Sequence, residues 1–161
     1  MKTKNILLAV FYLQIVNYIL PTIVSAQSFN LLWSQFSNPA PGGASGVAVD
    51  GTSLYVVGSD YVSGSDSQWR IEKRNLSTGT VIWTQTINPS NNSDEVAAIA
   101  VDGTGLYVVG GIDGNTLWRM EKRDLNTGAV LWVVTTTSST STPLSSSAYG
   151  VVVDEIGRAH V

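Results

Sequence analysis

The stretch that decides the fold reads AVDGTSLYVVG, Ala48 to Gly58, and it returns as AVDGTGLYVVG, Ala100 to Gly110, 52 residues later. A second pair of segments follows the same order. WRIEKRNLSTGTVIW runs from Trp69 to Trp83, and WRMEKRDLNTGAVLW from Trp118 to Trp132. Self-similarity at such a period is typical of repeat architectures, in which each unit is one supersecondary module stacked on its neighbours. The chain is therefore predicted to be a repeat protein.

Each repeat divides into four short β-like runs separated by turn residues. The runs predicted for the first repeat are Gly46–Val49, Leu54–Gly58, Gln68–Arg74 and Thr80–Thr86. Those predicted for the second repeat are Val96–Val101, Leu106–Gly110, Leu117–Arg123 and Ala129–Thr135. Asp-Gly pairs are expected to close the first turn of each repeat and Thr-Gly pairs the third, because glycine permits positive φ.

Four antiparallel strands in a repeat of about 50 residues are typical of a β-propeller blade. We predict an all-β fold, a β-propeller fragment of antiparallel meanders with two complete blades at 44–87 and 95–136. Partial blades flank them. Segment 27–37 matches a fourth strand and is expected to close a missing last blade, and 137–155 is a linker with the start of a third blade.

The two ends of the chain are expected to lie outside the repeat fold. Residues 1–26 have the charged start, apolar centre and small-residue cleavage site of a secretory signal peptide, with cleavage before Gln27. An uncleaved anchor is the alternative, but Pro21 ends the apolar run short of the roughly 20 residues that a spanning helix needs. We expect a secreted, periplasmic or cell-surface protein with no membrane span after cleavage.

The last six residues, 156–161, depart from the repeat, which would continue with Gly-Thr after Asp154. They match the translation of a sequencing adapter, so we interpret them as an adapter-derived scar; the alternative is a genuine divergent tail. The chain's one histidine, His160, lies in this segment.

Charge and composition exclude several functions. All six basic residues between 27 and 155 lie in the two WR-x-EKR copies, so no basic patch for nucleic acid and no polybasic membrane-binding tract is expected. With no cysteine, and no histidine before 156, we expect no catalytic nucleophile–base pair and no metal site in the visible segment. Carboxylate-bearing loops at Asp60 with Asp66, at Asp94-Glu95 and at Asp113 could hold calcium, but none has the spacing of a calcium loop, so solvated acids are favoured.

A family resemblance rests on the two Thr-Gly segments. Asn75 to Trp83 and Asp124 to Trp132 resemble the tryptophan-docking motif D-x-x-T-G-x-x-x-W of quinoprotein-type propellers, and the GVAVD and LYVVG segments resemble propeller repeats of secreted and cell-surface proteins. In that family the tryptophan packs between adjacent blades and the Thr-Gly turn positions it. The resemblance implies a structural docking role for five residues: Trp33, Trp83, Trp132, Gly79 and Gly128.

Differences between the repeats indicate where a ligand would bind. The links 38–45, 59–67, 88–95, 111–116 and 136–147 vary in length or sequence, and in a meander they emerge on one face. Insertions in repeat proteins tend to map to the binding face, although simple tolerance of loop variation is the alternative. Alternating charges at Arg70-Glu72-Arg74 are read as an ion-pair ladder rather than an anion site. Asn75 and Asn91 are candidate glycosylation acceptors, meaningful only if the host glycosylates exported proteins.

Two functions remain. The first is an exported binding or scaffolding module, non-catalytic in the visible segment, with an unidentified protein or carbohydrate ligand on the variable-loop face. The second, implied by the resemblance, is the N-terminal part of a quinoprotein dehydrogenase that uses pyrroloquinoline quinone (PQQ) and calcium. No cofactor is evident from the residues themselves, and the enzyme question stays open with the non-enzymatic function favoured.

Overall fold

The computed structural model describes residues 31–36, 41–64, 66–136, 147–154 and 159–161. These residues form strands and connecting turns and no helix. The strands are β1 Gly42–Val49, β2 Ser53–Ser63, β3 Asp66–Asn75, β4 Val81–Ile87, β5 Glu95–Asp102, β6 Gly105–Ile112, β7 Leu117–Arg123, β8 Val130–Thr136, β9 Val152–Val153 and β10 Ala159–His160. In the part that is described, no helix is long and apolar enough to cross a membrane. The predicted signal peptide lies outside the described residues.

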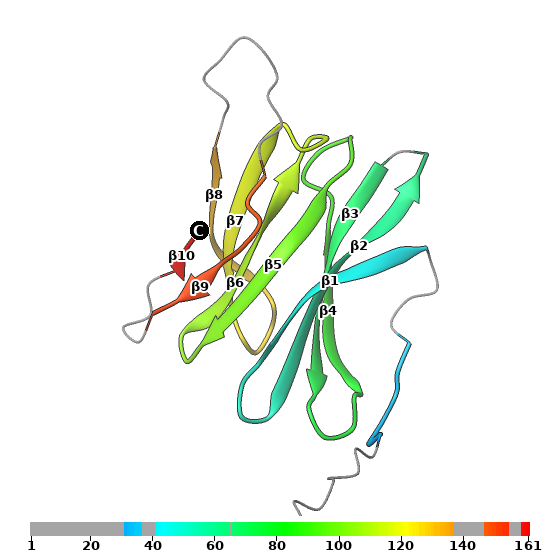
Figure 1. The fold of residues 1–161 in the computed structure, drawn as a ribbon, viewed down its shortest axis with the longest axis vertical. Helices are drawn as coiled ribbons and strands as arrows, with labels where there is room; N and C mark the ends of the chain where they lie inside the picture. Colours follow the sequence, from blue (N-terminus) through cyan, green and yellow to red (C-terminus); the bar gives the residue numbers. More distant parts are fainter. Residues whose placement is uncertain (1–30, 37–40, 65, 137–146, 155–158) are drawn as a thin grey trace, which may run out of the picture. The chain divides into compact units, whose positions relative to one another are not determined.

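The two repeats form two four-stranded antiparallel sheets, ordered β1-β2-β3-β4 and β5-β6-β7-β8 (Figure 1). Their registers are equivalent: Val49 pairs with Leu54 as Val101 pairs with Leu106, and both first strands carry a bulge before the paired core. All eight predicted strands are confirmed. The third copy of the repeat contributes β9, which pairs with β10 and also contacts β5.

Strand ends differ from the prediction in the first sheet. β2 continues to Ser63, and β1 begins at Gly42, so much of the expected loops 38–45 and 59–67 is strand. The extra residues pair with each other, since Gly42 lies opposite Asp60 and Tyr61 lies opposite Ser67. This pairing is between neighbouring strands of the same sheet, and the composition of residues 59–67 alone does not indicate it.

The core lies between the two sheets. One face of the first sheet contributes Tyr55, Val57, Trp69 and Ile71, and the second sheet contributes Val96, Ile99, Leu106, Val108 and Ile112. Every residue of β6 is buried, so this strand is covered on both faces. Trp69 is fully buried, and an aromatic side chain of this size removes about 150–250 Å² from water.

The hairpins β2–β3 and β6–β7 and the link from β4 to β5 lie at one end of the sheets (Figure 1). The β1–β2, β3–β4, β5–β6 and β7–β8 turns lie at the other end. The expected separation of variable links from fixed turns is therefore present in the described residues.

Candidate functional site

Three tryptophans share the fourth-strand position of the repeat: Trp33, Trp83 and Trp132. Trp33 contacts the β3–β4 turn and Trp83 contacts the β7–β8 turn. Trp33 lies in residues 31–36, which form no strand, and its Nε1–H donates to the Leu76 carbonyl at 3.1 Å. Trp83 Nε1–H, in β4, donates to the equivalent Leu125 carbonyl at 3.3 Å. Trp132 is 37 % exposed, and its ring meets Tyr107 edge-on with centroids 6.2 Å apart.

Each of these turns contains a glycine against which the indole packs. Gly79 and Gly128 both have φ of +72°, the left-handed region that glycine favours. A Cβ on Gly79 would lie 2.5 Å from Trp33 Cε3, and one on Gly128 would lie 2.9 Å from Trp83 Cζ3. Both the backbone angle and the ring therefore require glycine. That these contacts hold the blades together stays a prediction.

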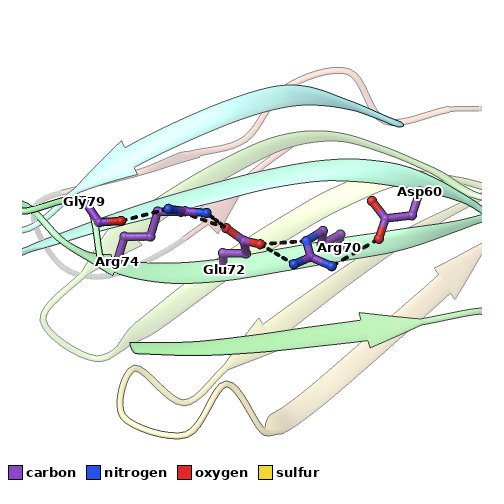
Figure 2. Close-up of polar contacts among 5 residues, drawn as sticks. All are labelled: Asp60, Arg70, Glu72, Arg74 and Gly79. Atoms are coloured by element: carbon purple, nitrogen blue, oxygen red, sulfur yellow. Dashed lines mark hydrogen bonds and ion pairs between the residues drawn. The ribbon is translucent and has the colours of Figure 1, made fainter. Parts of the chain in front are cut away.

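The charged motif beside the β3–β4 turn forms a ladder of ion pairs (Figure 2). Glu72 contacts Arg70 through Oε1 and Arg74 through Oε2, both at 2.6 Å, and Arg74 Nη1–H donates to the Gly79 carbonyl at 2.8 Å. Asp60 Oδ2 lies 3.3 Å from Arg70 Nη1 and adds one more ion pair to the ladder. Burial lowers the pKa of Arg70, but hydrogen bonds and charges from Glu72 outweigh it, so that pKa is raised.

The second sheet has the same ladder of ion pairs. Glu121 is fully buried and contacts Arg119 and Arg123 at 2.6 Å, and Arg123 donates to the Gly128 carbonyl at 2.6 Å. The ion-pair ladder predicted from the alternating charges is confirmed in both repeats. Since Arg74 and Arg123 each donate to a turn glycine, the ladder also fixes the turn that meets the tryptophan.

The Asp-Gly turns were predicted to depend on positive φ at glycine, and this is wrong, because Gly51 and Gly103 lack it. The aspartate closes the turn instead. Asp50 accepts two backbone N–H groups at 2.9 and 2.7 Å and the Tyr55 hydroxyl at 2.9 Å. Asp102 accepts the equivalent two N–H groups at 2.7 and 2.8 Å.

These hydrogen bonds shift the pKa values of the two aspartates and of Tyr55. Burial raises the pKa of Asp50 and of Asp102, but the hydrogen bonds together outweigh burial, so both pKa values are lowered. Burial first, and then the bond to Asp50, raises the pKa of Tyr55 to about 12. Each carboxylate is therefore held ionised, which the turn needs because a carboxylate accepts all of these donors.

At the opposite end, hydrogen bonds join the variable links into one surface. We define the loop face as the β2–β3 hairpin tip, 59–67, the link 88–95, the loop 111–116 and Ser147. Asp94 is its fully buried centre. Its carboxylate accepts from Ser90 N–H at 2.9 Å, from Ser90 Oγ at 2.7 Å and from Asp113 N–H at 3.0 Å. Sequence reasoning took Asp94 for a solvated acid, and the structure shows that this is wrong.

Further contacts connect the two sheets and the third repeat across this face. Ser67 forms a parallel bridge with Ser93, and their hydroxyls are 2.9 Å apart. Asn92 donates to the Asp113 carboxylate at 2.6 Å, and Ser147 donates to the Asn115 amide oxygen at 3.1 Å. Asp60, also predicted to be solvated, is buried at 6 % exposure. Sequence signals for these partners are absent, because the partners lie far apart along the chain.

A shallow hollow opens on the loop face between the sheets. Its volume is about 270 Å³, and its lining includes Ser59, Tyr61, Ser67, Ser93 and Glu95. Tyr61 and Val62 beside it are 59 % and 49 % exposed. The candidate acceptor Asn91 is exposed on this face, whereas the Asn75 amide oxygen accepts two N–H groups of its own turn.

A calcium–PQQ centre needs a group of ligands that can hold the metal ion. Calcium takes six to eight oxygen ligands. Within the described ranges, no group of three or more His, Cys, Asp or Glu side chains could hold a metal ion. Asp60 instead contacts Arg70, Asp94 accepts from Ser90, and Asp113 accepts from Asn92. The described residues therefore offer no such group of side-chain ligands for the calcium ion.

The comparisons with known proteins agree with the fold. A family model described as "Outer membrane protein assembly factor BamB" matches residues 22–158. No curated protein and no solved structure matches the chain. The family is a β-propeller of PQQ-like repeats, so the predicted fold class and the predicted resemblance are confirmed, and the two sheets are blades. Because the match covers well over half of its residues, the chain belongs to the family of the outer membrane protein assembly factor BamB.

Proposed function

We propose that this chain belongs to an exported β-propeller that binds a protein partner through the loop face. The observation that carries the proposal is the hollow bordered by exposed Tyr61, on a surface whose links are hydrogen-bonded to one another through Asp94. Aromatic side chains beside a pre-ordered frame are typical anchors of protein interfaces, because little conformational entropy is lost on binding. The matched family is named for a factor in protein assembly, which favours a protein over a carbohydrate.

Within this proposal, the tryptophans and turn glycines are structural. Trp83 and Gly128 join one blade to the next, and Trp33 packs on the first blade in the same way. The loop face would then be a surface assembled from several blades. Binding is expected to depend on the inter-blade contacts even though they lie at the other end of the sheets.

Site-specific photocrosslinking tests the proposed interface. A benzophenone amino acid replaces Tyr61 in the exported protein in its own cells, and the matched control replaces Thr78, exposed on the opposite turn. We expect one discrete adduct from position 61, identifiable by mass spectrometry, and none from position 78. Equal adducts from both positions, or none from position 61, would contradict a protein-binding loop face.

Two further measurements separate the remaining alternatives. PQQ with calcium, added to the purified chain, should leave its tryptophan fluorescence unchanged, and saturable quenching would favour the dehydrogenase. Export is proposed from residues 1–26, and N-terminal sequencing of protein recovered outside the cytoplasm should begin at Gln27.

A further inference from the structure

Trp69 fills a socket in the second blade. Its ring is fully buried, and a Cβ on Gly110 would lie 2.9 Å from Trp69 Cζ2, so the ring packs against that glycine. Within the described ranges, Trp69 Nε1 has no hydrogen-bond partner. The socket therefore accepts the indole by shape and apolar contact.

The first blade has the same socket on the face that points away from the second blade, and there it is a cavity of about 330 Å³. Its lining includes Ala44, Val56, Gly58, Arg70 and Glu72. The repeat places these residues at the positions of Val96, Val108, Gly110, Arg119 and Glu121.

The two sockets also agree in backbone geometry. A Cβ on Gly58 would meet the carbonyl oxygen of Gly43, as one on Gly110 would meet the carbonyl oxygen of Glu95. Glycine is thus required in both sockets by the bulged first strand. The difference is that Trp69 occupies only the second.

We propose that the cavity beside Gly58 is a socket for an indole ring, presented by the third strand of another blade of this repeat. The occupant is a tryptophan at the position that Trp69 and Trp118 hold in their strands. A cavity of this size is at the lower end of small-ligand sites, which suits one aromatic side chain. The cavity lies on a sheet face and not on the loop face, so a negative result here would leave the proposed protein-binding role of the loop face unchanged.

One residue makes this socket more polar than the other. Asp60 stands where the second blade has Ile112, and it lines the cavity with its carboxylate 3.3 Å from Arg70. A carboxylate accepts N–H donors. The indole of tryptophan is therefore expected to bind more tightly than the phenyl ring of phenylalanine.

The direct test titrates the full chain with N-acetyl-L-tryptophanamide and follows backbone amides by NMR. We expect a dissociation constant in the roughly millimolar range, typical of one buried ring, with shifts confined to the amides around Gly58 and Arg70. Ala44→Phe fills the cavity and should weaken binding at least about tenfold. Val47→Phe, on the same strand and outside the cavity lining, should not. N-acetyl-L-phenylalaninamide should bind more weakly.

A second arm identifies the source of the ring. Sedimentation velocity compares the chain with Trp118→Ala, which removes the half-buried third-strand indole of the second blade. Self-association that this variant abolishes, together with probe binding by the variant, supports a second copy as the occupant. Probe binding by a chain that stays monomeric supports a blade elsewhere. A monomeric chain without localised shifts would overturn the proposal.

Discussion

Gly128→Ala tests whether the turn glycine and the tryptophan join the two blades. Gly128 has φ of +72°, and an added Cβ would lie 2.7 Å from Gln85 Cγ and 2.9 Å from Trp83 Cζ3. Two penalties therefore add. The left-handed backbone costs an L-residue about 1–2 kcal/mol, and the methyl group must displace the indole from its place on the turn.

The second penalty follows from the contacts that the indole makes. Overpacking a filled site costs about 1–3 kcal/mol. Moving the ring instead endangers the 3.3 Å bond from Trp83 Nε1 to the Leu125 carbonyl, which contributes about 0.5–1.5 kcal/mol. Because the structure will take whichever route costs less, we expect a total loss of about 1.5–3.5 kcal/mol in the free energy of unfolding.

Gly114→Ala is the matched control. Gly114 has φ of +67° but nothing within 4 Å of an added Cβ, so this variant should show the backbone penalty alone, about 1–2 kcal/mol. Urea unfolding followed by far-UV circular dichroism measures both variants, provided the transition is two-state. Equal losses from the two substitutions would refute the contact with Trp83. In a double-mutant cycle with Trp83→Ala, the double variant should lose less stability than the sum of the two single losses, because the added methyl group then meets no indole.

Three other perturbations have definite expected results. Asp94→Ala leaves buried N–H groups without an acceptor and should lower the free energy of unfolding by about 1–3 kcal/mol. Hydrogen exchange at the Asp113 amide should become faster, and unchanged exchange there would contradict its hydrogen bond to Asp94. Glu121→Gln leaves two arginines without their full counter-charge and should cost about 3–5 kcal/mol in urea unfolding, and a loss near zero would show that the ladder is solvated. Asp50 and Asp102 have lowered pKa values in the folded chain, so their contribution to the free energy of unfolding is present above the unfolded pKa of about 3.9 and is lost as pH falls through the folded pKa. Replacing both by Asn should flatten the acid limb of stability against pH, and an unchanged slope would refute the assignment.

The strands could be predicted from the sequence because their signals are local. An apolar run bounded by Asp-Gly or Thr-Gly has one reasonable pairing with the next run, and the 52-residue repeat doubles every such signal. The WR-x-EKR ladder was predictable for the same reason, since alternate residues of a strand share a face. Local signals failed at Gly51 and Gly103, where the side chain of the preceding aspartate, rather than positive φ, closes the turn.

The candidate site could not be predicted in the same way. Asp94 looks like any acid in a polar link, and its burial depends on Asp113, 19 positions later, and on Ser67, 27 positions earlier. The extension of β2 to Ser63 likewise needs the opposite strand in place. The contacts of Asp94 arise where two blades meet, so a single repeat carries no signal of them.

The short motif WR-x-EKR with its Thr-Gly turn links the interior of one blade to the surface of the next. In the first blade Arg74 fixes the Gly79 carbonyl, while Lys73, the neighbouring residue on the other face, donates to the Leu125 carbonyl of the second blade at 2.9 Å. Trp83 donates to that same carbonyl. Two donors from one blade thus converge on one acceptor of the next, and a carbonyl oxygen has two lone pairs to receive them. Because adjacent residues of a strand point to opposite faces, Lys-Arg is the shortest sequence that can hold its own turn and the following blade together.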